Sequence, residues 1–487
     1  MVGWILNLGY ALALLASSPV WLARMVRYGK YRRDWSQRLG KAPKRYGLQP
    51  VIWIHGVSVG EVSAARQLVA QLHEQLPDFR VAVSSTTDTG VAAARRLFAP
   101  DHQVFRWPAD FTFTVARALD RLAPSMVILM EGDVWPNFVR TCRRRDIPVV
   151  VVNGRIGPHK GYPRYKRIRP LAAGLFNSLT AIGVQHEAYA DLYRALGVRN
   201  DKLHVTGMVK YDTADLGDRV AGQEELAAAV GLKAGEKLLV AGGTGAGEEK
   251  IVLEAYRRLL ESLPGAGETP AARAGKMPAT RTPKTPVAPV RLAIVPRKPE
   301  RFNEVAELIA REGFGLIRRS ERPNGWAPDP PGAGRPAIPD CFPTPNGPRS
   351  VILGDTMGEL RKFYALASAV FVGRSLVPEG GSDIIEAAGL GKAVCFGYHT
   401  FNFPQAETMV GAGAARRVAD VEELATVWRE WLKDEPAAAE IGHRAREFVR
   451  AQRGATRRNV EMICRIIGRV PAAVEGGIAT DAIEEPV

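Results

Sequence analysis

The chain has 487 residues, of which 46% are hydrophobic and 24% are charged. These proportions are typical of globular proteins and exclude a wholly disordered or fibrous chain, and the length predicts more than one domain. The 66 Lys and Arg residues outnumber the 51 Asp and Glu residues and give a formal net charge of +15, which favours anionic partners such as nucleotides, nucleic acid or an acidic membrane. The four cysteines contain no Cys-x-x-Cys pair, so neither a disulfide framework nor a zinc ribbon is indicated.

The first segment, residues 2–26, is an almost unbroken apolar run with Trp4 near one end and Trp21 near the other. It is long enough to cross or deeply enter a bilayer. The basic residues that accompany its end favour a cytoplasmic location for the following chain; they are Arg24, Arg27, Lys30, Arg32, Arg33, Arg38 and Lys41. We therefore predict a membrane-anchor or interfacial helix over residues 1–28 rather than a cleaved signal peptide, with a buried core helix as the alternative.

After the anchor, short apolar runs that resemble strands alternate with amphipathic helical stretches, which is typical of parallel sheets covered by helices on both faces. The expected strands of a first domain are 51–55, 80–84, 126–130 and 149–152, and those of a second are 237–240, 291–295, 351–353, 370–372 and 393–396. We expect two doubly wound Rossmann-like α/β domains, 29–215 and 216–475, that face a cleft. Exposed Pro/Gly-rich insertions are expected at 264–289 and 322–348, and a flexible tail at 476–487.

Between the first expected strand and a helix expected over 60–75 lies the loop 55–61. Its Gly56-Val57-Ser58-Val59-Gly60 matches the G-x-S-x-G elbow of serine hydrolases, but an elbow normally follows several earlier strands. The alternative is that Glu61 acts as a general base at a ligand site. A purely structural interpretation also exists, because an acidic residue is favoured in the first turn of any helix.

The second expected domain carries three further loops after strands. The Gly-rich loop 242–249 offers backbone N–H groups to an anion but lacks the Gly-Lys-Ser/Thr ending of a nucleotide triphosphate loop. Arg297 follows a buried strand and could bind a phosphate, or belong to a solvated turn. Gly380-Gly381 are expected to open a helix, with Asp383 and Glu386 on one face of it and Glu386 available to ribose hydroxyls.

In chain order, these segments resemble the 3-deoxy-D-manno-octulosonic acid (Kdo) transferases of lipopolysaccharide assembly. The resemblance rests on the anchor and on residues 53–61, 85–90, 135–137, 153–155, 206–212, 296–302, 354–360, 380–386, 399 and 402–403. Two departures fall in the second half. Ser382-Asp383 stand where the family pattern has His and Asn, and Gly243–Glu249 replace its Ser-Thr-His-x-Gly-Glu-Glu stretch.

The resemblance implies a two-domain GT-B architecture and an inverting transfer of Kdo from CMP-Kdo to a lipid A precursor similar to lipid IVA. It further implies no cofactor or metal, no nucleic-acid partner, and a place on the anionic cytoplasmic face of the inner membrane. Glu61 matches the family's proposed catalytic base. The expected donor-binding residues are Arg297, Lys210, Gly358, Glu359, Gly380, Gly381, Glu386 and Asn402, and those near the acceptor or cleft are Ser58, Gly60, Thr87, Glu131 and Arg155. A non-catalytic anchored module that binds acidic lipid is the alternative from another class.

Overall fold

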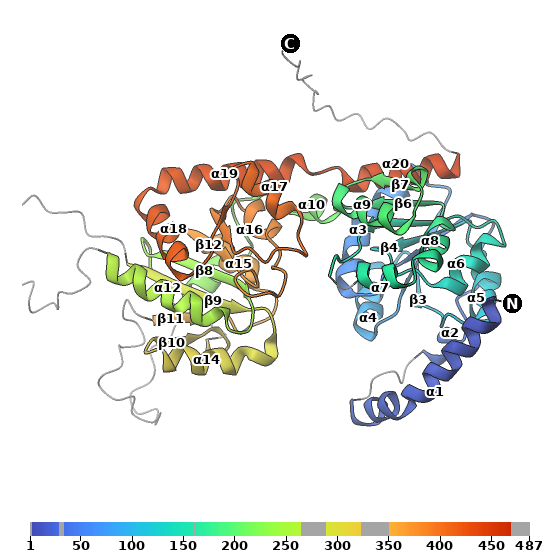
Figure 1. Cartoon of the computed structure of the whole chain (residues 1–487), viewed down its shortest axis with the longest axis horizontal. Helices are drawn as coiled ribbons and strands as arrows, with labels where there is room; N and C mark the ends of the chain where they lie inside the picture. The colour runs from blue at the N-terminus through green and yellow to red at the C-terminus, as the bar shows by residue number, and fades with distance from the viewer. Residues whose placement is uncertain (1, 29–33, 160, 264–288, 323–349, 469–487) are drawn as a thin grey trace, which may run out of the picture. The chain divides into compact units, whose positions relative to one another are not determined.

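A computed structural model describes residues 2–28, 34–159, 161–263, 289–322 and 350–468 (Figure 1). The chain forms two compact units: Met1–Thr213 together with Gly454–Val487, and Ala214–Arg453. The expected insertions at 264–289 and 322–348 lie outside the described residues except at their flanking positions 289 and 322, and so does the expected tail at 476–487. The cleft expected between the two domains stays a prediction.

The first unit is built on a seven-stranded parallel sheet whose strand order is β3-β2-β1-β4-β5-β6-β7. Its strands are β1 (Val51–His55), β2 (Arg80–Ser85), β3 (Gln103–Arg106), β4 (Met126–Met130), β5 (Val149–Gly154), β6 (Ala181–Val184) and β7 (Leu203–Val205). The runs expected from the sequence coincide with strands because a strand buried on both faces is apolar throughout.

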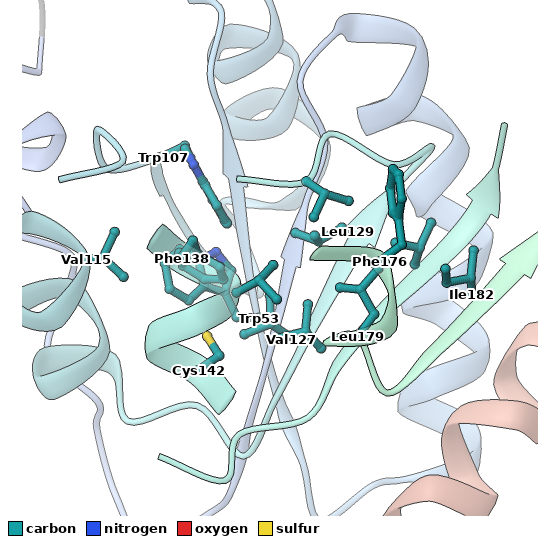
Figure 2. Packing of buried hydrophobic residues seen from close by; sticks show 14 of the residues in the cluster. Trp53, Trp107, Val115, Val127, Leu129, Phe138, Cys142, Phe176, Leu179 and Ile182 are labelled. Carbon is teal, nitrogen blue, oxygen red and sulfur yellow. The ribbon is translucent and has the colours of Figure 1, made fainter. Parts of the chain in front are cut away.

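Helices cover the sheet of the first unit; they are α2 (Trp35–Arg38), α3 (Val59–Gln75), α4 (Asp88–Phe98), α5 (Thr112–Leu122), α6 (Pro136–Arg143), α7 (Gly161–Arg167), α8 (Arg169–Asn177), α9 (Glu187–Leu196) and α10 (Lys210–Thr213). Successive strand residues point to opposite faces, so Trp53 belongs to one core cluster and Ile52 and Ile54 belong to another. On the Trp53 side, the Phe138 ring packs edge-on to Trp53 at 5.2 Å (Figure 2). Each face of the sheet therefore has its own hydrophobic core.

The last described helix, α20 (Ala455–Ile467), returns to the first unit. Its apolar side chains Val460 and Ile463 are buried in the same cluster as Val62 of α3. The carboxylate of Asp212 accepts hydrogen bonds from the N–H groups of Gly454 and Thr456, which caps the start of the helix. This division differs from the expected one, in which the second domain continued to residue 475.

The second unit repeats the architecture with the strand order β10-β11-β9-β8-β12-β13-β14, again parallel. Its strands are β8 (Lys237–Thr244), β9 (Val290–Pro296), β10 (Gly315–Arg318), β11 (Ser350–Leu353), β12 (Ala369–Val372), β13 (Val394–Phe396) and β14 (Arg416–Arg417). Its helices are α11 (Gln223–Ala229), α12 (Glu248–Ser262), α14 (Phe302–Arg311), α15 (Leu360–Leu366), α16 (Ile385–Gly389), α17 (Gln405–Gly411), α18 (Val421–Lys433) and α19 (Glu435–Ala451).

The N-terminal helix α1 (Val2–Tyr28) is long and apolar enough to cross a membrane. None of its apolar window is buried within the described part of the chain. The alternative of a buried core helix is therefore wrong, because a core helix hides its apolar side chains from water.

Candidate active site

The strand orders locate one candidate ligand site in each unit. In doubly wound parallel sheets, ligands bind beyond the carboxyl ends of the strands, at the point where the strand order reverses direction. This point lies between β1 and β4 in the first unit and between β8 and β12 in the second. Glu61 lies in the first turn of α3, shortly after β1; of the Gly-rich segment 242–249, residues 242–244 end β8 and residues 245–247 form the loop that follows it. Two segments that the sequence marks as candidate ligand sites therefore lie at the reversal points of the two sheets.

Glu61 lies in the first turn of α3, and its carboxylate is held at two points. Its Oε2 accepts the N–H of Val57 at 2.8 Å and its Oε1 accepts the hydroxyl of Ser58 at 2.9 Å. Ser58 is the N-cap of the helix and its Oγ in turn accepts the N–H of Glu61 at 3.4 Å. This resembles a capping box, in which an N-cap Ser and an acidic residue three positions later satisfy the exposed donors of the helix. Gly60, between them, is exposed.

The carboxylate of Glu61 has a raised pKa. The largest cause is burial, which disfavours the charged form; the Val57 N–H and Ser58 hydroxyl oppose it, and the negative charges of Glu131 and Asp133 add to it. A carboxylate has about four lone-pair positions, of which the bonds from Val57 and Ser58 use two. Glu61 is therefore fixed in orientation, keeps capacity to accept a proton, and is more basic than an ordinary glutamate.

Glu131 follows β4 directly, across the reversal point from β1. Its φ of 60° is left-handed, a conformation that is costly for a residue with a side chain and is often found at functional sites. Its Oε2 pairs with Nε of the exposed Arg155 at 2.9 Å. Asp133, two residues later, was not among the residues proposed from the sequence, although Glu131-Gly132-Asp133 directly follows a buried strand. Burial also raises the pKa of Asp133.

Thr87 links two neighbouring loops of the first unit. Its hydroxyl donates to the carbonyl of Val57 at 2.9 Å and also accepts the N–H of Gly90 at 3.0 Å, as the N-cap of α4. Of the five residues expected near the acceptor, Ser58, Thr87, Glu131 and Arg155 thus belong to loops at the carboxyl edge of the sheet, and Gly60 lies in the first turn of α3.

The geometry does not favour a serine hydrolase. Ser58 has an extended backbone (φ −109°, ψ 167°) and its hydroxyl donates to Glu61, whereas an elbow nucleophile sits in a strained turn beside a histidine base. The imidazole of His55 bonds instead to Ser84 and Thr86. Burial lowers the pKa of His55 to about 3, so this ring stays neutral.

We expect His55 to make the protein less stable in acid. Its ring is 1% exposed and stacks on Trp107 at 3.8 Å. An unfolded histidine binds a proton below about pH 6.5, and the folded ring does so only near pH 3. Above the pKa of an unfolded histidine, the neutral His55 ring costs the folded protein nothing. As the pH falls below that value, the unfolded chain gains a proton that the folded chain cannot take up, and the free energy of unfolding drops by about 2 kcal/mol between about pH 7 and about pH 5. Urea unfolding of the wild type and of His55→Gln at both pH values measures this difference. The exposed His73→Gln is the control, and an equal pH slope in wild type and His55→Gln would contradict the assignment.

In the second unit, one backbone N–H of the Gly-rich loop after β8 already bonds to a carboxyl group of the chain itself. The fully buried carboxylate of Glu248 accepts the N–H of Gly245 at 3.1 Å and those of Ser375 and Leu376 at 2.9 Å, and it also accepts the N–H of Arg374. The Gly245 N–H is therefore already taken by Glu248, and phosphate binding by this loop stays a prediction. Glu248 ties the loop after β8 to the loop after β12.

Arg297 directly follows β9, and its N–H donates to the carbonyl of Thr244 at 3.1 Å. Its side chain is exposed. The charges of Arg297 and Glu386 both affect the pKa of the buried Tyr364. Burial is the largest cause of that residue's raised pKa, the charge of Glu386 adds to it, and the charge of Arg297 opposes it. Two of the expected donor-binding residues are thus electrostatic neighbours of one side chain.

Gly380, Gly381 and Asn402 come together beyond β12 and β13. Both glycines are left-handed, with φ of 89° and 85°, and a Cβ on Gly380 would lie 2.1 Å from Nδ2 of Asn402. The helix expected at the glycine pair begins later, at Ile385. Asp383 therefore precedes the helix instead of sharing a face with Glu386, and its Oδ1 accepts the N–H of Ile385 at 2.9 Å.

The remaining expected donor residues have other surroundings. Glu359 pairs with Arg319 at 3.0 Å and bonds to Thr356. Burial acts to raise its pKa, but the bonds from Thr356 and Arg319 outweigh it, and the pKa is lowered. The bonds of Glu359 thus join the loop after β11 to Arg319. Its neighbour Gly358 has a left-handed φ of 85°. Lys210 begins α10 in the first unit.

The two departures from the family pattern touch each other. The hydroxyl of Ser382 donates to the carbonyl of Gly243 at 2.7 Å, and a Cβ on Gly243 would lie 2.8 Å from that hydroxyl. Arg374, next to them in the loop after β12, has a left-handed φ of 61° and pairs with Glu379 at 2.9 Å. Nothing in the sequence had marked Arg374. No group of three or more His, Cys, Asp or Glu residues that could hold a metal occurs among the described residues.

Comparisons with known proteins agree with this arrangement. Residues 33–213 match the family described as 3-Deoxy-D-manno-octulosonic-acid transferase (kdotransferase). A 3-deoxy-D-manno-octulosonic acid transferase of Bordetella pertussis is 31% identical over 93% of this chain and 98% of its own length. One of Haemophilus influenzae is 29% identical over 93% of this chain and 97% of its own. A glycosyltransferase structure from Rickettsia africae, 14% identical, covers 86% of this chain and 99% of that chain with a TM-score of 0.57.

Two doubly wound parallel-sheet units and the likeness to a solved glycosyltransferase define the fold as the two-domain GT-B glycosyltransferase type. The likeness to the Bordetella relative extends over nearly the whole of both chains. The chain belongs to the 3-deoxy-D-manno-octulosonic acid transferase family, and it is a glycosyltransferase.

Proposed function

We propose that the protein transfers Kdo from CMP-Kdo to a lipid A precursor of the lipid IVA type during lipopolysaccharide assembly. The observation that carries the proposal is the Glu61 carboxylate, fixed by Val57 and Ser58 at the reversal point of the first sheet, in a chain that belongs to this family. We assign this site to the acceptor and the carboxyl edge of the second sheet to the donor.

The proposed chemistry is a single displacement. An acceptor hydroxyl attacks the anomeric carbon of Kdo, its proton passes to Glu61, and the bond from that carbon to the CMP phosphate oxygen breaks with its electron pair leaving on the phosphate. One attack from the side opposite the leaving group inverts the anomeric carbon. The acceptor hydroxyl is the only nucleophile in this scheme. Glu61 removes its proton and forms no covalent bond to the sugar, so no side chain has to act as a nucleophile.

The leaving CMP carries negative charge that must be stabilised. Arg297 supplies a guanidinium at the end of β9, and the planar fork of arginine suits a phosphate. Gly380, Gly381 and Asn402 form a close-packed turn beyond β12 and β13, in which a Cβ at Gly380 is excluded. We assign Glu386 to a ribose hydroxyl. The raised basicity of Glu61 supports its role as a base, and the proposal requires no metal or other cofactor.

We further propose that the enzyme acts at the cytoplasmic face of the inner membrane, where the exposed apolar helix α1 and the basic residues after it meet an anionic surface. A non-catalytic lipid-binding module would share these two features. It would not share a half-buried, oriented Glu61 or membership of a transferase family.

Acceptor-dependent turnover tests the proposal. Purified full-length protein in detergent is expected to release CMP from CMP-Kdo when a lipid A precursor is present, and to release little when the precursor is omitted. A folded sample that binds the lipid precursor and releases no CMP would overturn the transfer reaction in favour of the lipid-binding module.

A further inference from the structure

The N-terminal helix α1 is apolar on most sides but carries Asn7 and Tyr10 on the side that meets the first unit. The amide of Asn7 donates to the hydroxyl of Thr112 at 2.7 Å, and its oxygen accepts the N–H of Thr112 at 3.1 Å and the amide of Asn137 at 3.1 Å. The hydroxyl of Tyr10 donates to Asp110 at 3.0 Å. These bonds hold the first half of the helix against the first turns of α5 and α6 and against Asp110, which precedes α5.

A second contact holds the other half of α1. The ring of Trp21 lies 6.3 Å from that of Trp35 in α2. The helix α2 is itself attached to the sheet, because Gln37 accepts the backbone N–H of Arg106 in β3 at 2.7 Å. Positions early and late in α1 thus both contact the first unit.

These two contacts are incompatible with a helix that crosses a bilayer. From Tyr10 to Trp21 a helix rises about 16 Å at 1.5 Å per residue. The hydrocarbon core of a bilayer is about 30 Å thick. A water-soluble unit that touches both positions, and that includes the 6% exposed carboxylate of Asp110, would have to enter the hydrocarbon for α1 to cross it.

The outward side of α1 has the chemistry of a lipid-inserting surface. Its side chains are apolar and largely exposed; they are Trp4, Ile5, Leu8, Leu12, Leu15, Val20, Leu22 and Val26. Phe113, next to Thr112 in the first unit, is also 61% exposed. No Asp or Glu occurs before Asp34, whereas Arg24 lies near the end of the apolar run and Arg27, Lys30, Arg32 and Arg33 follow it. An apolar face beside positive charge is complementary to an anionic bilayer surface.

We propose that α1 lies in the plane of the cytoplasmic leaflet, fastened to the first unit by Asn7 and Tyr10, and inserts its outward apolar side chains without crossing the membrane. This inference rests on the proposed membrane location, and it replaces the spanning form of the anchor prediction. Both ends of α1 then lie on the same side of the membrane. In-plane helices enter about 5–10 Å into the headgroup and acyl boundary.

Cysteine accessibility in sealed inside-out vesicles of the inner membrane, whose cytoplasmic face is outward, tests the proposal. The full chain carries Ser in place of its four cysteines and one cysteine in a short Gly-Ser tag ahead of Met1. We expect a membrane-impermeant maleimide to label this tag before detergent is added, to the same extent as Lys44→Cys, an exposed site on the first unit. A tag that reacts only after detergent would place the N-terminus across the membrane and overturn the proposal.

A matched pair of variants tests the fastening. Asn7→Leu with Tyr10→Phe removes the bonds to Thr112, Asn137 and Asp110 while α1 stays apolar, and we expect part of the tag to become protected. Ser17→Leu adds the same kind of apolar group at an exposed position without touching these bonds, and the tag should stay accessible. Full accessibility of the tag in the double variant would show that Asn7 and Tyr10 do not set the orientation of α1 in the membrane. It would overturn the proposal that these two residues fasten the helix.

Kdo transfer is measured in the same vesicles. Transfer with a protected tag contradicts the in-plane helix and leaves the proposed reaction standing. An accessible tag without transfer contradicts the reaction and leaves the helix orientation standing.

Discussion

Glu61→Gln is expected to lower the rate of Kdo transfer by about 10²- to 10⁴-fold, the range for removal of a general base. The amide cannot take the proton of the acceptor hydroxyl. It has nearly the shape of the carboxylate and can still accept the N–H of Val57 through its oxygen, so the start of α3 should stay folded. Single-turnover transfer with saturating CMP-Kdo measures the effect, and CMP affinity should not change.

A structural role of Glu61 must be separated from a catalytic one, because its bonds to Val57 and Ser58 also cap α3. Ser58→Ala removes one of those bonds and the N-cap, at a cost of about 1 kcal/mol in stability, while the carboxylate remains. We expect Ser58→Ala to keep far more activity than Glu61→Gln. Equal losses in the two variants, matched by equal losses of stability, would show that the cap and not the proton transfer is what matters.

The pH dependence provides an independent check on Glu61. Burial and the charges of Glu131 and Asp133 raise its pKa, so the carboxylate takes up a proton at a higher pH than an ordinary glutamate does. The rate should fall as the pH falls through this raised pKa. Replacement of the nearby charge in Glu131→Gln should move the acidic limb of the rate profile to lower pH.

Arg297→Ala is expected to weaken the binding of CMP by about 1.5–3 kcal/mol, the range for a hydrogen bond to a charged group. Calorimetry with CMP on the folded full-length protein measures this difference. Arg297→Lys should recover part of the affinity, because it keeps the charge but loses the planar fork. Lys298→Ala, which removes an exposed positive charge one residue away, is the control, and equal effects at the two positions would indicate a general charge effect instead of a contact.

The fold was predictable from the sequence where burial dictates the pattern. Buried parallel strands must be apolar along their whole length, so the expected runs 51–55 and 126–130 have the same bounds as β1 and β4. The return of α20 to the first unit was not predictable. Its apolar stripe would fit either sheet, and the choice depends on the cap from Asp212 and on packing against α3, which only the folded chain brings together.

The candidate site shows the same contrast. The place of Glu61 at the start of a helix followed from a strand-loop-helix pattern, and the Ser58-x-x-Glu61 spacing already contained the signal of a capping box. The late start of α16 and the left-handed Arg374 had no such signal. A left-handed position normally calls for glycine, so Arg374 could be recognised only from the backbone. The strand order that brings Glu131 across from β1 is likewise a tertiary property.

The mass of the acceptor after reaction tests the central claim most directly. Wild-type protein, CMP-Kdo and a defined lipid A precursor should give a product heavier than the precursor by one or more Kdo residues, with one CMP released for each residue added, and Glu61→Gln should give almost none. An unchanged acceptor mass with folded wild-type protein that binds both CMP and the lipid precursor would contradict the account.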